Sequence, residues 1–486
     1  GRVCFPNMFL PMWNLEGYPV YRESLEYPYG RVNSNYTDMV MRTEIEENSL
    51  KSINLASYFP REWPSGMVPY LYGGLFVDYL QETQKDGRFE EVFRENADNV
   101  LPWLVQKNAR DVYDRSFYAL WEQWQQEAVR RYTRQVDQIR EKGVTEPRVL
   151  TDSGYFTTMP RFSSDGQSLY YTRMTNYNIP ALMRVWLNTG EKEKLASIHM
   201  PSWLSVSGNG RVLLADLEYY KTYYMYNDVF TYNHGYDRQT CGMRIQSVDP
   251  FPDGTMACVQ IENDRYRLLV LGKDYSVLRV LIEKTSLQIS GVRVSPGGKR
   301  LVFSARDAAG YSHLFLYDMQ NNTMLRLTTG TYSCMHADWY PDGSKVVFVS
   351  DRDGVYNLYN IDVNTGQVQK LTSVIGGVFW PDVSPDGSRI AVASYGKDGF
   401  NVGIIPHPAD AEVVVTIPSE PADGYFQAAA VYGDQERFGR ESGGYNPLYS
   451  LVNPAWLPVL YSEEIYPDGY DSWYGFYTMG ADTLYR

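Results

Sequence analysis

Six glycines recur along the chain at an almost constant interval. They are separated by 44 residues, or once by 45, and are Gly166, Gly210, Gly254, Gly298, Gly343 and Gly387. A fixed period of roughly 40 to 45 residues is typical of β-propeller blades, which are small sheets arranged around a common axis. The period therefore predicts six repeated units.

Each of these glycines follows the same kind of turn and precedes an apolar segment. The fifth unit has YPDGSKVVFVS and the sixth has SPDGSRIAVAS. Pro presets φ, Asp caps the turn and Gly accepts φ > 0. The alternation of Val346, Phe348 and Ser350 predicts a half-buried strand.

Later segments of the units complete the expected blades. Residues 313–319 and 357–363 supply a third strand, and the segments LRLTTG and VQKLTS supply a fourth. Four strands per unit are what a propeller blade needs. We therefore predict a mainly β fold, with a six-bladed β-propeller over 144–420.

The repeat resembles a known family. The pattern S-P-D-G-x-x-[IV]-[AV]-[FV], then S-D-R-D-G-x-x-x-[IL]-Y-x-x-D, then L-T, is similar to the TolB-type (WD40-like) propeller repeat. The match is strong at 338–372 and at 381–394, fair at 293–328, and weak in the second unit, where Gly208-Asn209-Gly210 replaces Pro-Asp-Gly. The resemblance implies the fold but no activity, since one fold hosts many functions.

Two segments compete to close the ring. Leu150-Thr151 lies as far before Arg161 as Leu371-Thr372 lies before Asp382. Residues 147–151 therefore resemble the fourth strand of a blade in sequence. VVVTI at 413–417 occupies the same place in the last unit. Both alternatives stay open at this point.

One position of the repeat, five residues before each glycine, is polar in every unit. It is occupied by Arg161, Ser205, Asp249, Arg293, Asp338 and Asp382. We call these six residues the column, and we expect them on the innermost strands, facing the central channel or its mouth. There they either receive a peptide terminus or partner loop, or pair with one another around a water-filled channel.

Nothing in the sequence forms a catalytic constellation. The five histidines are scattered over different units, without a nucleophile in a G-x-S-x-G elbow. The 45 basic and 58 acidic residues give a net charge of -13, which repels phosphate backbones. Nucleic acid is therefore not an expected partner, whereas a protein or peptide is.

Residues 1–143 lack the propeller repeat and have helical periodicity instead. Helical periodicity runs through FEEVFRENADNVLPWLV and through SFYALWEQWQQEAVRRYTRQVDQIREKG. Phe117, Leu120, Trp121 and Trp124 recur at three and four spacing and mark a buried stripe, and Gly143 is a suitable stop. An α-helical domain is expected before the propeller.

Two segments of this region resemble gluzincin metallopeptidases. PMWNLEGYPVYRES is similar to their P-x-W-x-x-E-G-x-x-x-Y-x-E segment, and VPYLYGGLFVDYLQE is similar to the helix that follows. The resemblance implies that Glu16 is the third zinc ligand, or else a glutamate in a degenerate or structural role. Asn14 and Pro19 differ from the residues usual in the gluzincin segment, and proline is unfavourable inside a helix.

The gluzincin motif H-E-x-x-H is absent from the sequence. A hydrolytic zinc site needs three protein ligands and the motif's Glu as base. We therefore expect a peptidase remnant with no cofactor in this chain, and zinc only in a longer parent protein.

Residues 421–486 form a linker and an aromatic segment. Alternation around 456–461 and 473–477 predicts two strands with aromatic residues suited to a lipid interface. The segment resembles the opening hairpin of surface-antigen-type outer-membrane β-barrels, although a strand pair that docks on the propeller is the alternative. The resemblance implies association with the outer membrane.

The sequence supports two functional hypotheses. The first is a non-catalytic protein-interaction scaffold of the cell envelope, in the periplasm or at the outer membrane of a Gram-negative bacterium. The second is a zinc metallopeptidase with its H-E-x-x-H helix upstream, whose propeller gates substrate access. The sequences at both ends of the chain resemble the middle of larger domains, so we expect a fragment of a larger protein.

Overall fold

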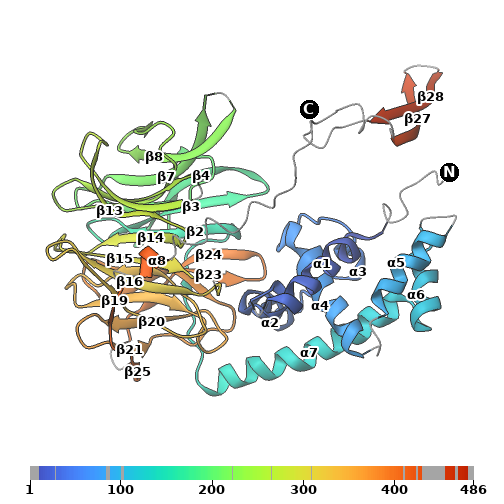
Figure 1. The fold of residues 1–486 in the computed structure, drawn as a ribbon, viewed down its shortest axis with the longest axis horizontal. Helices are drawn as coiled ribbons and strands as arrows, with labels where there is room; N and C mark the ends of the chain where they lie inside the picture. Colours follow the sequence, from blue (N-terminus) through green and yellow to red (C-terminus); the bar gives the residue numbers. More distant parts are fainter. Residues whose placement is uncertain are drawn as a thin grey trace.

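A computed structural model describes the chain at residues 10–27, 29–83, 88–99, 103–221, 223–263, 265–307, 309–408, 411–422, 425–428, 455–465 and 469–479. Figure 1 shows helices grouped beside a ring of sheets, with helix α7 running towards the ring. Among the helices within these ranges, none has the length and apolarity to cross a lipid bilayer.

The first part of the chain is helical. Its elements are α1 (Met12–Glu26), η1 (Arg31–Asn33), α2 (Asn35–Glu46), α3 (Ile53–Ala56), η2 (Ser65–Met67), α4 (Val68–Thr83), α5 (Phe89–Asp98), α6 (Val105–Tyr113) and α7 (Phe117–Glu141). The predicted stripe of α7 is buried, the Ser116 side chain accepts from Ala119 N at the helix start, and Gly143 has a φ of +84°. The helix predicted over 89–105 is interrupted: α5 ends at Asp98, while residues 100–102 lie outside the described ranges.

Helices α1 and α4 approach each other at glycines. A Cβ on Gly73 would lie 2.3 Å from the Trp13 carbonyl oxygen, and one on Gly17 would lie 2.4 Å from the carbonyl carbon of Gly73. Side chains at these two positions would force the helices apart. Pro19 lies inside α1, contrary to our expectation, where its ring is exposed to solvent.

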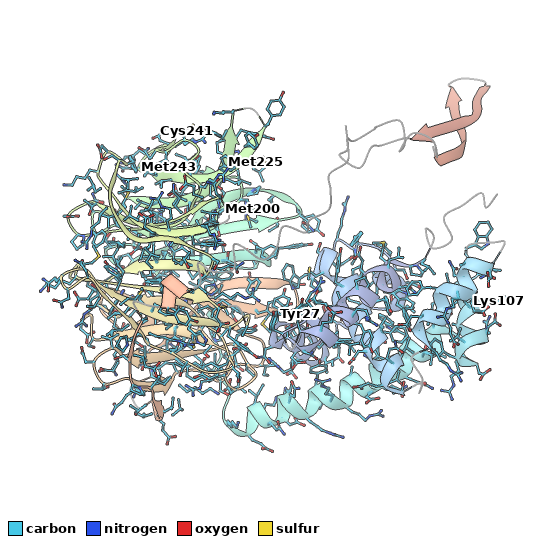
Figure 2. The ribbon with its side chains drawn as sticks, in the orientation of Figure 1. Tyr27, Lys107, Met200, Met225, Cys241 and Met243 are labelled. Atoms are coloured by element: carbon cyan, nitrogen blue, oxygen red, sulfur yellow. The ribbon has the colours of Figure 1, made fainter. Side chains whose placement is uncertain are left out.

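The strands form six blades, of which the first five have four successive strands and the sixth has three; pairing of β2 with β24 joins blades 1 and 6 in one sheet. The strands of blades 1 to 3 are β2 (Tyr155–Phe162), β3 (Ser168–Thr175), β4 (Asn178–Trp186) and β5 (Lys192–Ser197); β6 (Trp203–Val206), β7 (Val212–Tyr220), β8 (Tyr224–Tyr232) and β9 (Tyr236–Arg238); and β10 (Ile245–Pro250), β11 (Met256–Glu262), β12 (Arg265–Leu271) and β13 (Val277–Thr285). In blade 2 the hairpin of β7 and β8 carries exposed tyrosines and Met225 (Figure 2).

Blades 4 to 6 match the strongest repeats of the sequence. Their strands are β14 (Gln288–Val294), β15 (Arg300–Arg306), β16 (Ser312–Asp318) and β17 (Thr323–Arg326); β18 (Cys334–Trp339), β19 (Lys345–Ser350), β20 (Asn357–Asp362) and β21 (Gln367–Lys370); and β22 (Val378–Val383), β23 (Arg389–Gly396) and β24 (Gly399–Pro406). The mainly β, propeller-type fold with an N-terminal helical region is thereby confirmed.

The ring closes through the segment that precedes blade 1. Strand β1 (Arg148–Val149) pairs antiparallel with β24 and supplies the fourth strand of blade 6. Strand β25 (Val413–Thr416) instead pairs with β21 as a fifth strand of blade 5, and β26 (Glu420–Pro421) adds to β17. Of the two alternatives, the one at 147–151 is therefore correct.

Strand β19, the second strand of blade 5, is more deeply buried than predicted. In β19, Val346 to Ser350 are all buried, so this strand is not half-buried. Each blade is packed between two others, and both faces of its middle strands are covered. All six repeat glycines have positive φ, between +67° and +88°, as the turn prediction requires.

The last described elements are short. Helix α8 (Tyr425–Ala428) packs Phe426 against Phe303 and Phe315 of blade 4. Strands β27 (Ala455–Ile465) and β28 (Gly469–Met479) form an antiparallel hairpin where two strands were predicted. The predicted linker at 432–447 lies outside the described residues.

Candidate functional site

The column residues lie on the first strand of each blade. They belong to β2, β6, β10, β14, β18 and β22, in that order. Five of them line a cavity of about 420 Å³, and Ser205 does not; its buried hydroxyl donates to the Val248 carbonyl at 2.7 Å. The sequence therefore identified the repeat position that lines the cavity, with Ser205 as the exception.

The cavity opens on one face of the propeller. Its wall includes residues of the turns between first and second strands, among them Ser164, Ser207, Pro252, Pro296 and Pro385. In an antiparallel blade these turns lie at the end opposite to the turns between second and third strands. The helices contact the opposite end, where Tyr155 Oη donates to the Arg61 carbonyl at 2.7 Å and Arg42 Nε donates to the Ile375 carbonyl at 3.1 Å.

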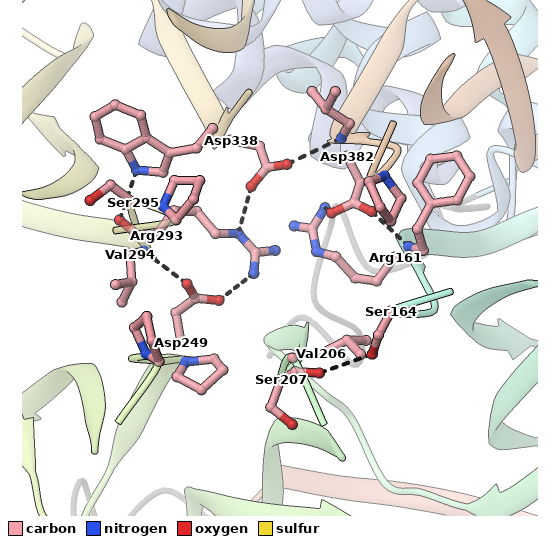
Figure 3. Close-up of a pocket in the computed structure, with 18 of the residues that line it drawn as sticks. Arg161, Ser164, Val206, Ser207, Asp249, Arg293, Val294, Ser295, Asp338 and Asp382 are labelled. Atoms are coloured by element: carbon pink, nitrogen blue, oxygen red, sulfur yellow. Dashed lines mark hydrogen bonds and ion pairs between the residues drawn. The ribbon is translucent and has the colours of Figure 1, made fainter. Parts of the chain in front are cut away.

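Three carboxylates and two guanidinium groups form the charged wall (Figure 3). Arg293 Nη1 lies 2.7 Å from Asp249 and its Nε lies 3.7 Å from Asp338. Arg161 Nη1 lies 3.3 Å from Asp382. The carboxyls outnumber the guanidinium groups by one, and the carboxyls of Asp338 and Asp382 come from adjacent blades with no arginine between them.

Each carboxylate also joins two neighbouring blades. Asp249 accepts from the backbone N–H of Val294, Asp338 from that of Val383, and Asp382 from that of Phe162. Each of these donors follows a column position in the next blade. The carboxylates consequently have a structural role whatever the cavity binds.

Burial dominates the protonation of these acids. It raises the pKa of Asp382 to about 7, against the opposing charge of Arg161. It also raises the pKa of Asp338, and it places the pKa of Asp249 well above its usual range. Burial therefore favours the protonated, uncharged form of these three carboxyls when the cavity is empty.

An aromatic layer lies beneath the cavity. The guanidinium carbons of Arg161 and Arg293 lie 5.7 Å and 4.5 Å from the ring centroid of Trp203. A Cβ on Gly291 would lie 2.9 Å from the same indole, which therefore reaches from blade 2 to blade 4. The rings of His336 and Trp380 stack with their centroids 4.5 Å apart.

The sequence analysis did not predict this aromatic layer. Trp203, His336 and Trp380 each precede a column residue by two positions, so the repeat could have indicated that they lie together. His336 and Trp380 have positive φ and lie at register shifts of β18 and β22. Such bulges add a residue to the strand and turn its side chain to a new direction.

Glu16 has a different environment from the column. It lies half-buried on α1, close enough to Tyr70 of α4 to contribute, after burial, to the raised pKa of that phenol. Within the described ranges, no three His, Cys, Asp or Glu side chains come together as metal ligands. The described residues therefore do not fit a zinc site, and a ligand role for Glu16 stays a prediction.

Comparison with known proteins supports the assignment of the propeller. Residues 251–420 match the model of the TolB β-propeller domain. An uncharacterized protein of Agrobacterium fabrum is 30% identical over 233 residues, which cover 43% of this chain and 79% of that protein.

More distant matches cover smaller parts of their partners. A tricorn protease homolog of Saccharolobus solfataricus is 28% identical over 151 residues, which cover 30% of this chain and 13% of that protein. The solved structure of the tricorn protease aligns with a TM-score of 0.41 and 14% identity, over 57% of this chain and 27% of that one. From the family match and the Agrobacterium relative, the chain belongs to the family of TolB-type β-propeller proteins.

Proposed function

We propose that this chain is a non-catalytic protein-interaction scaffold of the bacterial cell envelope, which binds a protein or peptide in the propeller cavity. The observation that carries the proposal is a cavity of about 420 Å³ with five charged residues, on the face away from the helices. Ligand sites are commonly concavities of about 300 to 1,000 Å³ with a few placed polar groups.

The composition of the cavity supports binding without chemistry. Its wall contains no His, Cys or Lys, and the hydroxyls of Ser163 and Ser207 are bonded within their own turns. Nucleophilic catalysis needs a nucleophile beside a base, and among the lining residues only carboxylates engaged by arginines or backbone N–H groups are available. Recognition of a polar ligand is what such a wall can perform.

The envelope location is part of the same proposal. It is supported by membership of the TolB-type family and by the C-terminal β-hairpin, whose strands carry Trp456, Trp473 and several tyrosines in the sequence. Aromatic residues on strands suit a membrane interface. The expected site of action is the periplasm or the outer membrane.

A peptide selection with a blocked variant tests this function. A random peptide library with free N-termini, displayed on phage, is selected on the purified chain, and enriched peptides are synthesised for calorimetry. Gly208 lies on the cavity wall with no atom within 4 Å of a Cβ, so Gly208→Trp adds an indole at the rim. We expect this variant to weaken binding at least tenfold.

The control carries the same substitution in a homologous turn. Gly297 also has open space around a Cβ but does not line the cavity, so Gly297→Trp should bind as the wild type does. Circular dichroism verifies that both variants are folded. No enrichment of any peptide, or equal binding by the Gly208→Trp variant, would overturn the proposed function.

A further inference from the structure

We propose that the cavity selects a cationic group, an ammonium or guanidinium, at the tip of its ligand. This inference rests on the proposed function above and specifies its ligand. The shared chemistry has three sources in a peptide: the free N-terminus, a lysine side chain and an arginine side chain.

The accessible charged groups of the cavity are the carboxylates. The side chains of Asp249, Asp338 and Asp382 are 11%, 15% and 14% exposed, whereas those of Arg161 and Arg293 are each 4% exposed. Three acids also outnumber two bases. An entering group therefore meets mainly carboxylate oxygens.

The arginines are directed into the protein. Arg161 donates to the carbonyls of Pro160, Leu204 and Pro381. Arg293 donates to the Leu204 carbonyl and to Asp249. Its Nε, which has no hydrogen-bond acceptor, faces Asp338 at 3.7 Å. Both guanidinium groups also lie over Trp203, so they offer an anion little free bonding capacity.

Cation binding should be coupled to the protonation of the three acids. Burial raises the pKa of all three carboxyls and so favours their protonated form in the empty cavity. A bound cation favours the ionised form, because an opposite charge nearby lowers the pKa of a carboxyl. Because the described residues contain no metal-ligating cluster and two guanidinium groups flank the acids, an organic cation fits better than a metal ion.

The rim suits the stem that carries such a charge. Pro250, Phe251, Pro252, Pro296 and Pro385 line the wall near the mouth. Lysine and arginine side chains place apolar methylene groups behind a charged head. The methylene groups then contact the apolar rim while the head reaches the carboxylates.

Calorimetry on a selected peptide tests the inference and separates the sources. The probes are the strongest peptide from the phage selection, its N-acetylated form, a form with norleucine for lysine and citrulline for arginine, and a form with both changes. We expect the doubly neutral form to bind at least tenfold more weakly. The single changes identify which cationic group enters.

Matched variants locate the effect. Asp338→Asn keeps the shape but removes a charge, and should weaken the charged peptide about tenfold while leaving the doubly neutral one unchanged. Asp152→Asn, at a side chain that is 85% exposed and outside the wall, is the control. If Asp338→Asn does not fold, the salt dependence of wild-type binding decides, because a charge-selective site loses affinity from 50 to 500 mM NaCl.

Two failures are distinguishable. If the doubly neutral peptide binds the wild type as tightly as its parent, cation selection is wrong, although blocking by Gly208→Trp still supports peptide binding. If no peptide binds at all, the proposed function fails and this inference fails with it.

Discussion

Single column residues serve both the ring and the cavity. Asp382 accepts the backbone N–H of Phe162 in the neighbouring blade, and the same carboxyl pairs with Arg161 at the cavity wall. A carboxyl held by backbone donors keeps its position without a ligand. Preorganisation of this kind lowers the entropic cost of binding.

The raised pKa of Asp382 predicts a pH dependence of stability. The folded carboxyl has a pKa of about 7 and the unfolded one a pKa near 3.8, so between these values the folded protein binds the extra proton. The contribution of Asp382 to the free energy of unfolding therefore rises as pH falls from 7 to 4, by up to about 1.4 kcal/mol per pH unit.

Asp382→Asn should remove this contribution. Urea unfolding at pH 5 and pH 7.5 measures it as the difference in slope between the wild type and the variant. Asp152→Asn, whose exposed carboxyl pairs with Lys192, should not flatten the slope. Parallel pH profiles for the wild type and Asp382→Asn would contradict the prediction.

A second prediction concerns the glycine contact between α1 and α4. Gly73→Ala places a methyl group 2.3 Å from the Trp13 carbonyl oxygen, so we expect a loss of roughly 1–3 kcal/mol in the free energy of unfolding. Gly66→Ala, whose nearest neighbour is Phe59 at 4.0 Å, should change stability little. The helical signal at 222 nm during urea unfolding reports both; equal midpoints would disprove the contact.

At the level of elements, the ring depends on a very short strand. Only Arg148 and Val149 form β1, with support from Leu150 N, which donates to the Val402 carbonyl at 2.8 Å. The Thr151 hydroxyl accepts from Val402 N at 2.9 Å. These bonds join residues about 250 positions apart, so closure is a long-range contact that forms at an entropic cost.

Leu150→Pro should open this closure. The substitution removes the donor to Val402, and we expect a cost of roughly 1–3 kcal/mol together with faster hydrogen exchange in β24. Val414→Pro changes an exposed residue of β25, the strand added to blade 5, and should leave exchange in β24 unchanged. Equal exchange in β24 of both variants would show that β1 does not hold the ring.

At the scale of the molecule, the helices and the propeller share a core. Trp63 is 5% exposed and contacts the rings of Tyr155, Phe156, Tyr395 and Phe400, and its Nε1 donates to Tyr395 Oη at 2.8 Å. A buried tryptophan across a junction couples the stability of its two sides. The helices therefore act as a fixed cover of one propeller face.

Trp63→Ala should uncouple the two parts. We expect a loss of roughly 3–5 kcal/mol and a thermal unfolding curve that splits into two transitions, one for each part. Trp103→Ala removes a tryptophan that is 64% exposed and serves as control. A single transition at an unchanged temperature for Trp63→Ala would show that the junction does not couple the parts.

Much of this architecture was predictable because the period and the turn chemistry are local signals. The strands of blades 4 to 6 follow from the turns before Gly298, Gly343 and Gly387. Which segment closes the ring was not predictable, because 147–151 and 413–417 both resemble a fourth strand in sequence. The two segments differ only in the strand with which each pairs, and that strand is distant in the sequence. Likewise the period located the column, whereas its pairing and the position of Trp203 depend on contacts between blades.

The aromatic layer has a consequence for the shape of any ligand. Trp203 lies against both arginines of the cavity wall, so we expect its indole to limit how deeply a ligand can enter. A partner that enters at the mouth should then leave by the mouth. We therefore expect a folded partner to present a protruding end, and not an extended chain that threads through to the helices.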